Sequence, residues 1–299
     1  MLMGISTCSL CPHGCSDRSL GICGAPDDLR VASVCIHNGE EPPISPAVNV
    51  FFAHCNLHCI YCQNWQISGR QADDCSILTV DALADRICDL LPQTGGMLGF
   101  VTPTHYANQL PAIVEAVRQR GISPTVVYNS SGYESVQTLR NLEGLVDIYL
   151  PDFKYMDSAL AARYSHAPRY PEVAQEALLE MIRQVGTGLK CADGIAYRGI
   201  IVRHLVLPGH IDNSLAVLDK LSTLHSQLST FNSLHVSLMA QYYPPRPDLP
   251  APLNRTLTPE EYRIVADRYV ELGFDGWLQE LSAEDNYRPD FSRNENPFE

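Results

Sequence analysis

Three cysteines on one short loop have the clearest chemical potential in this chain. Cys55, Cys59 and Cys62 follow a C-x3-C-x2-C spacing. Three thiolates on one loop can bind three irons of a cubane iron–sulfur cluster and leave the fourth iron without a protein ligand. A zinc site completed by His54 or His58 is the alternative, but zinc usually takes paired C-x2-C or C-x2-H groups. We therefore favour a [4Fe–4S] cluster with one open iron.

Four more cysteines lie near the N-terminus, at Cys8, Cys11, Cys15 and Cys23. Four thiolates would complete a metal site, so a metal held there would be structural or would carry electrons. The sequence does not distinguish zinc from a second iron–sulfur cluster, and His13 and Cys35 are possible substitute ligands. Disulfides are the less favoured alternative, because we expect a cytoplasmic protein.

The composition narrows the class of protein. The 299-residue chain has 45% hydrophobic residues and a formal net charge of -13, enough apolar content for one large domain. No Lys/Arg stretch is dense enough to follow a phosphate backbone, which argues against bulk nucleic acid as a partner. No window reaches the roughly 20 apolar residues of a membrane span, and the N-terminus lacks signal-peptide features. We expect a cytoplasmic protein that binds no membrane.

Short apolar runs alternate with longer amphipathic stretches along most of the chain. The runs typical of strands are Val48–Ala53, Leu98–Val101, Thr125–Tyr128, Val146–Leu150, Ile200–Leu207 and His235–Ala240. The helical patterns are Val80–Leu91, Gln109–Gly121, Tyr133–Leu142, Pro171–Val185, Asn213–Leu228 and Pro259–Leu272. This alternation predicts a parallel sheet, either open and doubly wound or a partial barrel.

The elements divide the chain into three parts. Residues 1–46 form a Cys-rich extension, too short to build its own core and so stapled by metal. Residues 47–282 form the strand–helix domain, and 283–299 form a polar tail. Parallel strands place their chemistry at their carboxyl ends. Polar segments follow all six predicted strands, at 54–62, 102–106, 129–132, 152–154, 208–210 and 241–243.

The loop from Cys55 to Cys62, here called the cluster loop, resembles the signature of the radical S-adenosylmethionine (SAM) superfamily. Tyr61, just before the third cysteine, matches an aromatic that lies against the adenine of SAM in that family. The segments Cys8–Cys23, His37–Ser45 and Phe100–Tyr106 resemble proteins related to pyruvate formate-lyase activating enzyme. The resemblance extends from about residue 5 to 280. It implies an α/β fold with a partial (β/α)6 TIM-type barrel.

The resemblance also implies roles for residues that follow the strands. Asp152 and Lys154 match an Asp-x-Lys motif whose Lys contacts the SAM carboxylate, and Arg203 matches a fifth-strand Arg that helps to hold SAM. A cation near the carboxylate fixes the bound orientation. Asn129 and Ser131 fall on Asp-Thr-Asn-Gly, which helps to bind SAM and a monovalent cation in the activating enzymes.

Three departures from the activating enzymes leave SAM binding as the resemblance implies it but mean that the substrate does not transfer. Thr102–His105 replaces their Gly-Gly-Glu, Asn129 replaces an Asp, and Tyr242 or Tyr243 replaces a sixth-strand His. His105 is interpreted either as a contact to SAM or substrate or as a hydrogen-bonded loop histidine. One of the two tyrosines could face the cavity and return a hydrogen atom to a substrate radical.

Two adjacent carboxylates, Glu40 and Glu41, precede the first predicted strand. They could contact groups near the cluster. We favour the simpler interpretation that both side chains are exposed.

The functional hypothesis follows from the resemblance. A reduced flavodoxin- or ferredoxin-type donor supplies one electron, and SAM is cleaved to methionine and a 5′-deoxyadenosyl radical. The radical abstracts hydrogen from a small metabolite, peptide or protein residue, while the protein orients the reactants. One alternative is an enzyme that activates a glycyl-radical partner, which the altered loops slightly disfavour. An alternative of another class is a non-catalytic metal-binding or electron-transfer protein, although electron carriers usually give all four irons protein ligands.

Overall fold

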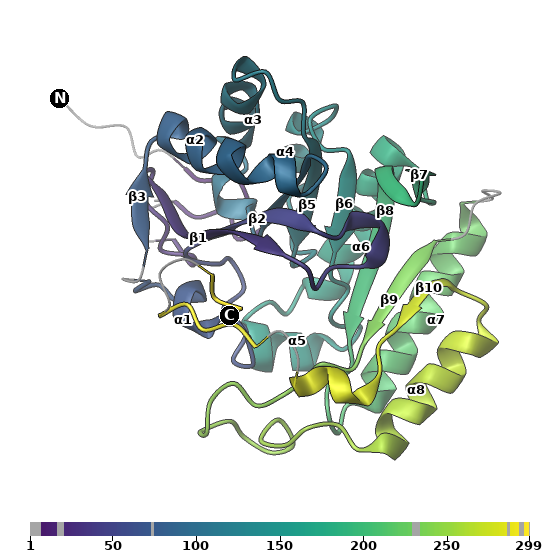
Figure 1. The fold of residues 1–299 in the computed structure, drawn as a ribbon. Helices are drawn as coiled ribbons and strands as arrows, with labels where there is room; N and C mark the ends of the chain where they lie inside the picture. Colours follow the sequence, from purple (N-terminus) through teal and green to yellow (C-terminus); the bar gives the residue numbers. More distant parts are fainter. Residues whose placement is uncertain are drawn as a thin grey trace.

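The structure is a computed structural model that describes residues 7–16, 21–72, 75–228, 234–285, 288–292 and 296–298. Within these residues the strands form a 10-stranded sheet in the order β10-β9-β8-β6-β5-β4-β2-β1-β3, with β7 paired to β8. Figure 1 shows this row curving from β3 and β1 at one end to β10 at the other.

A parallel set of strands forms the centre of the sheet. Its members are β2 (Ala47–Phe52), β4 (Met97–Val101), β5 (Thr125–Ser130), β6 (Ile148–Pro151), β8 (Ile195–Leu205), β9 (His235–Met239) and β10 (Asp275–Leu278). The residues of β2, β4 and β6 are all buried, as expected for parallel strands covered on both faces. The six predicted strands are therefore confirmed, and β10 adds a seventh that the sequence analysis missed.

Three antiparallel strands extend the parallel set. β1 (Leu29–His37) pairs with β2, β3 (Ser76–Leu78) pairs with β1, and β7 (Lys190–Ala192) pairs with β8. Alternate residues of β1 are buried, but its inward-facing set includes Ser33 and His37. Because these two inward-facing residues are polar, β1 lacks the regular alternation of apolar and polar residues by which a strand is predicted. Because β1 joins the sheet, this part of the predicted extension belongs to the main fold.

Helices cover the outside of the sheet. They are α1 (Trp65–Ser68), α2 (Val80–Leu90), α3 (Leu110–Gln119), α4 (Val136–Asn141), α5 (Ser158–Ser165), α6 (Tyr170–Val185), α7 (Ile211–Gln227) and α8 (Pro259–Glu271). Single 3-10 turns occur at Pro42–Ile44, Leu91–Gln93, Thr104–Tyr106 and Leu281–Asp285. Thr258 and Glu261 form a capping box at the start of α8, which satisfies two backbone donors of its first turn.

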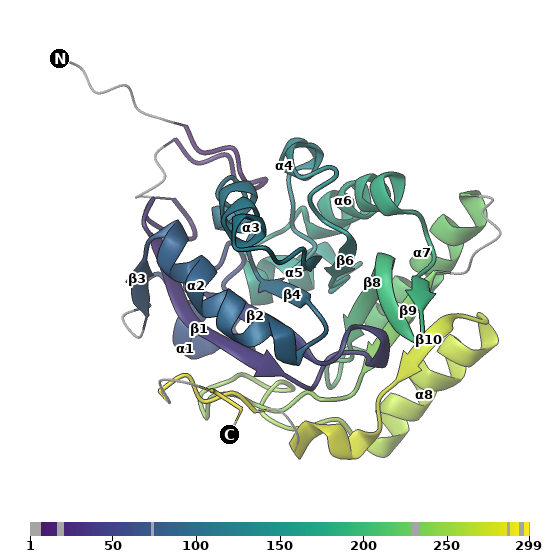
Figure 2. The same ribbon diagram turned by 45° about the horizontal axis from the view of Figure 1, so that its top comes forward.

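The described part of the C-terminal tail lies against the first strands. The ring of Phe291 lies 5.4 Å from that of Phe51, and Phe298 lies 4.2 Å from the ring of His37. Gln66 of α1 donates a hydrogen bond to Asp290 at 3.1 Å. Figure 2 shows this segment, in yellow, passing beside β1 and α1. The described part of the tail therefore packs against β1, β2 and α1.

No helix in the described ranges combines the length and the apolar character needed to cross a membrane.

Candidate cluster and cofactor site

An inner cavity of about 180 Å³ opens at the carboxyl ends of the parallel strands. Its lining contains the three cysteines of the predicted cluster loop and all six residues predicted for SAM, namely Cys55, Cys59, Cys62, Tyr61, Asn129, Ser131, Asp152, Lys154 and Arg203. These residues come from the loop after β2 and from the ends of β5, β6 and β8. Residues far apart in the sequence thus converge on one cavity.

The cluster loop has an unusual backbone. His54 and His58 adopt positive φ angles of 74° and 52°, a region that costs free energy for residues other than glycine. The N–H of Leu57 donates to the Cys55 sulfur at 3.4 Å. Such strain persists only where the surrounding structure holds it, so the loop is held in a shape that keeps the thiols at the cavity.

The three thiols lie together at the cavity and are shielded from solvent. Burial, followed by the charges of the other two thiols, raises the pKa of Cys55 to about 12. Burial also raises the pKa of Cys59 to about 11 and that of Cys62 above its usual range. Without metal these groups are protonated at neutral pH, and loading would release their protons. Their shared cavity and mutual influence fit a cubane, which takes one thiolate at each of three irons.

In the described ranges no group of three or more His, Cys, Asp or Glu side chains is arranged to hold one metal ion. A cluster makes a different demand, because its thiolates bind separate irons.

The ends of β5 and β6 meet closely at the cavity wall. Gly132 has φ +76°, and a Cβ there would lie 2.2 Å from the carbonyl oxygen of Asp152. Tyr170 joins the same two segments, because its hydroxyl donates to the Ser131 carbonyl at 2.7 Å and accepts from the Lys154 N–H at 2.9 Å. The glycine in Asn-Ser-Ser-Gly is therefore required by the approach of the two strands.

Ser131 offers a further sign that the cavity holds a polar ligand. Its hydroxyl is buried and has no hydrogen-bond partner among the residues that the structure describes. Buried hydroxyl groups are normally satisfied. Because Ser131 lines the inner cavity, a bound ligand with a polar group would supply the missing partner.

Asp152 and Lys154 form an ion pair at the cavity, with 2.5 Å between Lys154 Nζ and Asp152 Oδ2. Burial opposes the charged lysine, but the Asp152 carboxylate outweighs it and raises the pKa of Lys154. Lys154 therefore stays cationic in a buried place, where it could meet a carboxylate of a ligand.

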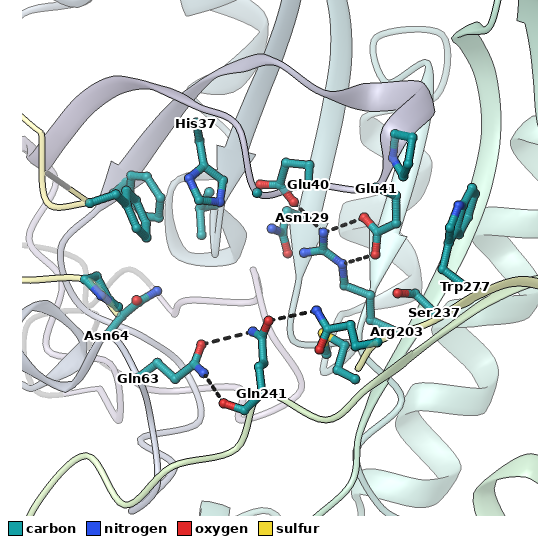
Figure 3. A pocket seen from close by; sticks show the side chains of 18 of the residues that line it. His37, Glu40, Glu41, Gln63, Asn64, Asn129, Arg203, Ser237, Gln241 and Trp277 are labelled. Atoms are coloured by element: carbon teal, nitrogen blue, oxygen red, sulfur yellow. Dashed lines mark hydrogen bonds and ion pairs between the residues drawn. The ribbon is translucent and has the colours of Figure 1, made fainter. Parts of the chain in front are cut away.

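Arg203 lies between Glu40 and Glu41, and this corrects the prediction that the two carboxylates are exposed. The Nε of Arg203 donates to Glu41 at 2.9 Å, and Nη2 donates to both carboxylates. The two acidic side chains are 7% and 6% exposed. The guanidinium holds the pKa of Glu40 below its usual range although burial acts in the opposite direction. Figure 3 shows the three side chains meeting at the cavity.

The position of Glu40 depends on two residues of the sheet. Asn49 of β2 donates to Glu40 at 2.7 Å. The Asn49 side chain needs space on β4, where a Cβ on Gly99 would lie 2.1 Å from its Oδ1. Glu40 is thus held by Asn49 of the sheet as well as by Arg203. The periodicity of the sequence alone does not reveal the contact between Glu40 and Asn49.

A second, outer cavity of about 320 Å³ adjoins the first. The two cavities share the lining residues Gln63, Asn64, Val101, Asn129, Arg203, Met239 and Gln241. Gln241 and Gln279 continue the polar lining: Gln241 Nε2 lies 3.3 Å from Gln63 Oε1, and Gln279 donates to Gln241 at 2.9 Å. Figure 3 shows the side chains of Gln63 and Gln241 joined by their hydrogen bond. Trp277 and Phe298 add apolar wall.

The residues predicted for catalysis lie elsewhere. Among the described residues that line the two cavities, His105, Tyr242 and Tyr243 do not occur. His105 is buried and its Nε2 lies 2.8 Å from the Ala53 carbonyl. The Tyr242 hydroxyl donates to the Leu253 carbonyl at 2.5 Å, and the Tyr243 ring packs under the guanidinium of Arg288. Gln241 directly precedes the two tyrosines, and its side chain lines both cavities.

A chain of hydroxyl groups runs from Tyr61 to the sulfur of Cys59. Tyr61 and Tyr155 share a hydrogen bond of 2.6 Å, and Tyr155 shares one of 2.7 Å with Ser165. Ser165 donates to the Cys59 sulfur at 2.9 Å. Ser165 was not predicted as a site residue, because α5 was not predicted either.

The N-terminal cysteines also lie together. The Cys8 N–H donates to the Cys15 carbonyl at 2.8 Å, and the charges of Cys8 and Cys23 contribute to the raised pKa of Cys11, for which burial is the main cause. None of these four cysteines forms a disulfide bond in the part of the chain that is described. Cys11 therefore lies near Cys8 and Cys23, and a metal site formed by the four cysteines stays a prediction.

Comparison with known proteins places the fold. No protein-family model matches the chain. An uncharacterised protein of Methanocaldococcus jannaschii is 28% identical over 266 residues, which are 85% of this chain and 71% of that protein. A putative glycyl-radical enzyme activating enzyme of Haemophilus influenzae is 24% identical over 107 residues, 36% of this chain and 40% of that protein.

Solved structures with a similar fold are radical SAM enzymes. Methylornithine synthase matches with a TM-score of 0.50 and 14% identity over 82% of this chain. HydG, a maturase of the [FeFe]-hydrogenase, matches with a TM-score of 0.52 and 13% identity over 79% of this chain. The chain spans 65% of the first protein and 53% of the second. The chain therefore has the radical SAM fold, a partial TIM-type barrel, which confirms the fold predicted from the sequence.

Proposed function

We propose that the chain is a radical SAM enzyme in which Cys55, Cys59 and Cys62 bind a [4Fe–4S] cluster. The observation that carries the proposal is the inner cavity, where these thiols meet the six residues predicted for SAM. A cluster with one open iron binds the amino and carboxylate groups of SAM and supplies the electron for its cleavage to methionine and a 5′-deoxyadenosyl radical. The residues around it orient the reactants and exclude water.

The chain provides separate groups for the two ends of SAM. Lys154 is a buried cation beside the cysteines and would bind the carboxylate of the methionine part. Tyr61 would lie against the adenine, held by its hydrogen bond to Tyr155. The Ser131 hydroxyl would find its partner on the ligand. Arg203 lines both cavities, so it would face SAM on one side and substrate on the other.

The substrate would occupy the outer cavity. Because the two cavities share part of their lining, a substrate bound there would lie beside a SAM molecule in the inner cavity. Side-chain amides can donate and accept hydrogen bonds, and Gln63, Gln241 and Asn64 suit a polar small metabolite or a peptide. An electron donor of the flavodoxin or ferredoxin type and a cytoplasmic location complete the proposal.

Activation of a glycyl-radical enzyme is the second candidate function. It is favoured by the similarity to the putative activating enzyme of Haemophilus influenzae. In that case a glycine loop of a partner protein would enter the outer cavity. A partner that is recovered with the chain and cleaved by oxygen at one glycine would support this function, whereas turnover of a free metabolite would contradict it. The non-catalytic alternative predicts a cluster that leaves SAM intact.

The test is an assay for 5′-deoxyadenosine. The protein is loaded anaerobically with iron and sulfide, reduced with dithionite and mixed with SAM. We expect the wild type and Cys191→Ala, a change at an exposed cysteine, to form 5′-deoxyadenosine. Cys59→Ala should form none. Intact SAM with fully loaded wild-type protein would contradict the proposal.

A further inference from the structure

The N-terminal cysteine loop is hydrogen-bonded to the cluster loop. His13 lies between Cys11 and Cys15 in the sequence, and its Nε2 lies 2.8 Å from the carbonyl oxygen of Asn56. Asn56 directly follows Cys55. One hydrogen bond therefore joins the backbone next to a cluster cysteine to a side chain between two N-terminal cysteines.

A second hydrogen bond makes the same connection in the opposite direction. The Nε2 of His58 lies 2.9 Å from the carbonyl oxygen of Ile22. His58 precedes Cys59, and Ile22 precedes Cys23. Each cysteine group thus contributes a histidine that contacts the backbone beside a cysteine of the other group. The two groups are held at a fixed separation with short covalent and hydrogen-bonded paths between them.

Other contacts hold the N-terminal loop firmly on the barrel. The buried Asn56 side chain donates to the Tyr133 carbonyl at 2.9 Å, and the His13 ring lies 5.2 Å from the ring of Tyr133. Thr138 of α4 donates to the Leu10 carbonyl at 2.9 Å. The loop is therefore built into the fold next to the cluster loop, not attached to it as a mobile tail.

The two cysteine groups face different places. Cys55 is buried, Cys59 and Cys62 are partly buried, and all three line the cavity that SAM would fill. Cys23 is buried, Cys8, Cys11 and Cys15 are partly buried, and none of these four lines either of the two adjoining cavities. A protein donor could approach them while SAM and substrate occupy the barrel.

We propose that Cys8, Cys11, Cys15 and Cys23 bind a second iron–sulfur cluster that passes electrons to the catalytic cluster. This inference rests on the proposed function. A one-electron protein donor with a flavin or an iron–sulfur centre is oxidised by one electron and reduces the N-terminal cluster. That cluster is then reoxidised as the catalytic cluster is reduced. Zinc has no redox chemistry and could not serve, so the proposal also selects the metal.

The metal content gives the first test. Wild-type protein loaded anaerobically should contain about eight irons per chain, four for each cubane, and no zinc. The triple variant C55A/C59A/C62A and the double variant C11A/C15A should each keep about four. The reduced triple variant should give an electron paramagnetic resonance signal that SAM does not alter. Zinc at the N-terminal site, or no metal there, would overturn the proposal.

The route of the electron gives the second test. In wild-type protein mixed with a reduced flavodoxin and freeze-quenched, the signal insensitive to SAM should rise before the signal shifted by SAM. C11A/C15A should lose reduction by flavodoxin but keep dithionite reduction and its SAM-shifted signal. H13A/H58A keeps all cysteines and should slow only the transfer between clusters. Flavodoxin reduction of C11A/C15A at the wild-type rate would refute the relay, whereas a signal in that variant without response to SAM would refute the proposed function.

Discussion

Ser165 Oγ donates a hydrogen bond to the Sγ of Cys59 across 2.9 Å. The serine is fully buried at the end of α5. It lies between the cluster loop and Tyr155, whose hydroxyl is 2.7 Å away. A hydrogen bond to a ligand sulfur stabilises the additional negative charge of a reduced cluster, and such bonds tune reduction potentials. The contact would therefore link a residue outside the inner cavity to the ease of electron uptake by the proposed cluster.

The first prediction concerns this hydrogen bond. Ser165→Ala should make the reduction potential of the catalytic cluster more negative. A hydrogen bond worth about 1 kcal/mol corresponds to roughly 40 mV for one electron. A redox titration followed by electron paramagnetic resonance, in the C11A/C15A background, would measure it. Tyr155→Phe keeps the Ser165–Cys59 contact and should shift the potential less. Equal potentials in wild type and Ser165→Ala would show that the bond does not tune the cluster.

The second prediction concerns the cation in the inner cavity. Lys154→Met should weaken SAM binding by roughly 10- to 100-fold, because a hydrogen bond to a charged group contributes about 1.5–3 kcal/mol. Calorimetric titration of the loaded, oxidised protein with SAM would measure the dissociation constant. Lys190→Met, at an exposed position on β7, is the matched control and should bind as the wild type does. An unchanged constant in Lys154→Met would remove this lysine from the SAM site.

The third prediction concerns the buried charges around Arg203. Arg203→Met leaves Glu40 and Glu41 without their cation, and removing one partner of a buried pair costs about 3–5 kcal/mol. The triple variant R203M/E40Q/E41Q removes all three charges and should recover most of that loss. Urea unfolding of the metal-free proteins would compare their free energies. Equal stability of Arg203→Met and wild type would mean that the ion pair forms only weakly.

The fourth prediction concerns pH. His204 is fully buried between the Phe153 carbonyl and Ser214 Oγ, and burial lowers its pKa from 6.5 to about 4. The folded state therefore prefers the neutral ring. Its stabilising effect is present above pH 6.5 and is lost as the pH falls towards 4. The free energy of unfolding should decline by about 2 kcal/mol between pH 7.5 and pH 5 from this group.

Urea unfolding of wild type and His204→Gln at both pH values isolates that contribution. The variant should show a shallower decline whatever its absolute stability. Parallel declines in the two proteins would mean that His204 is already charged in the folded state or keeps an ordinary pKa there.

Much of the fold could be predicted because buried parallel strands have a simple pattern. β2, β4 and β6 are buried throughout and almost entirely apolar, and polar residues follow where the strands end. Since the carboxyl ends of such strands meet, the convergence of Cys55 and Lys154 on one cavity was predictable in outline. β1 was not predictable in this way, because its inward-facing residues include polar ones.

The missed parts of the site depend on contacts between distant residues. Glu40 resembles any exposed carboxylate until Asn49 and Arg203 are placed beside it. Which residue after β9 lines the cavities depends on the path of the chain there. Gln241 does so, whereas the Tyr242 hydroxyl donates to the Leu253 carbonyl. Local pattern does not contain that information.

The central claim is that the thiols of Cys55, Cys59 and Cys62 hold a cluster whose open iron binds SAM. The most direct measurement is the electron paramagnetic resonance spectrum of the reduced C11A/C15A variant, recorded with and without SAM. This variant isolates the catalytic cluster from any signal of the N-terminal cysteines. The account predicts a signal that SAM shifts, and that Cys59→Ala in the same background abolishes. A fully loaded cluster with the same spectrum in both samples would contradict it.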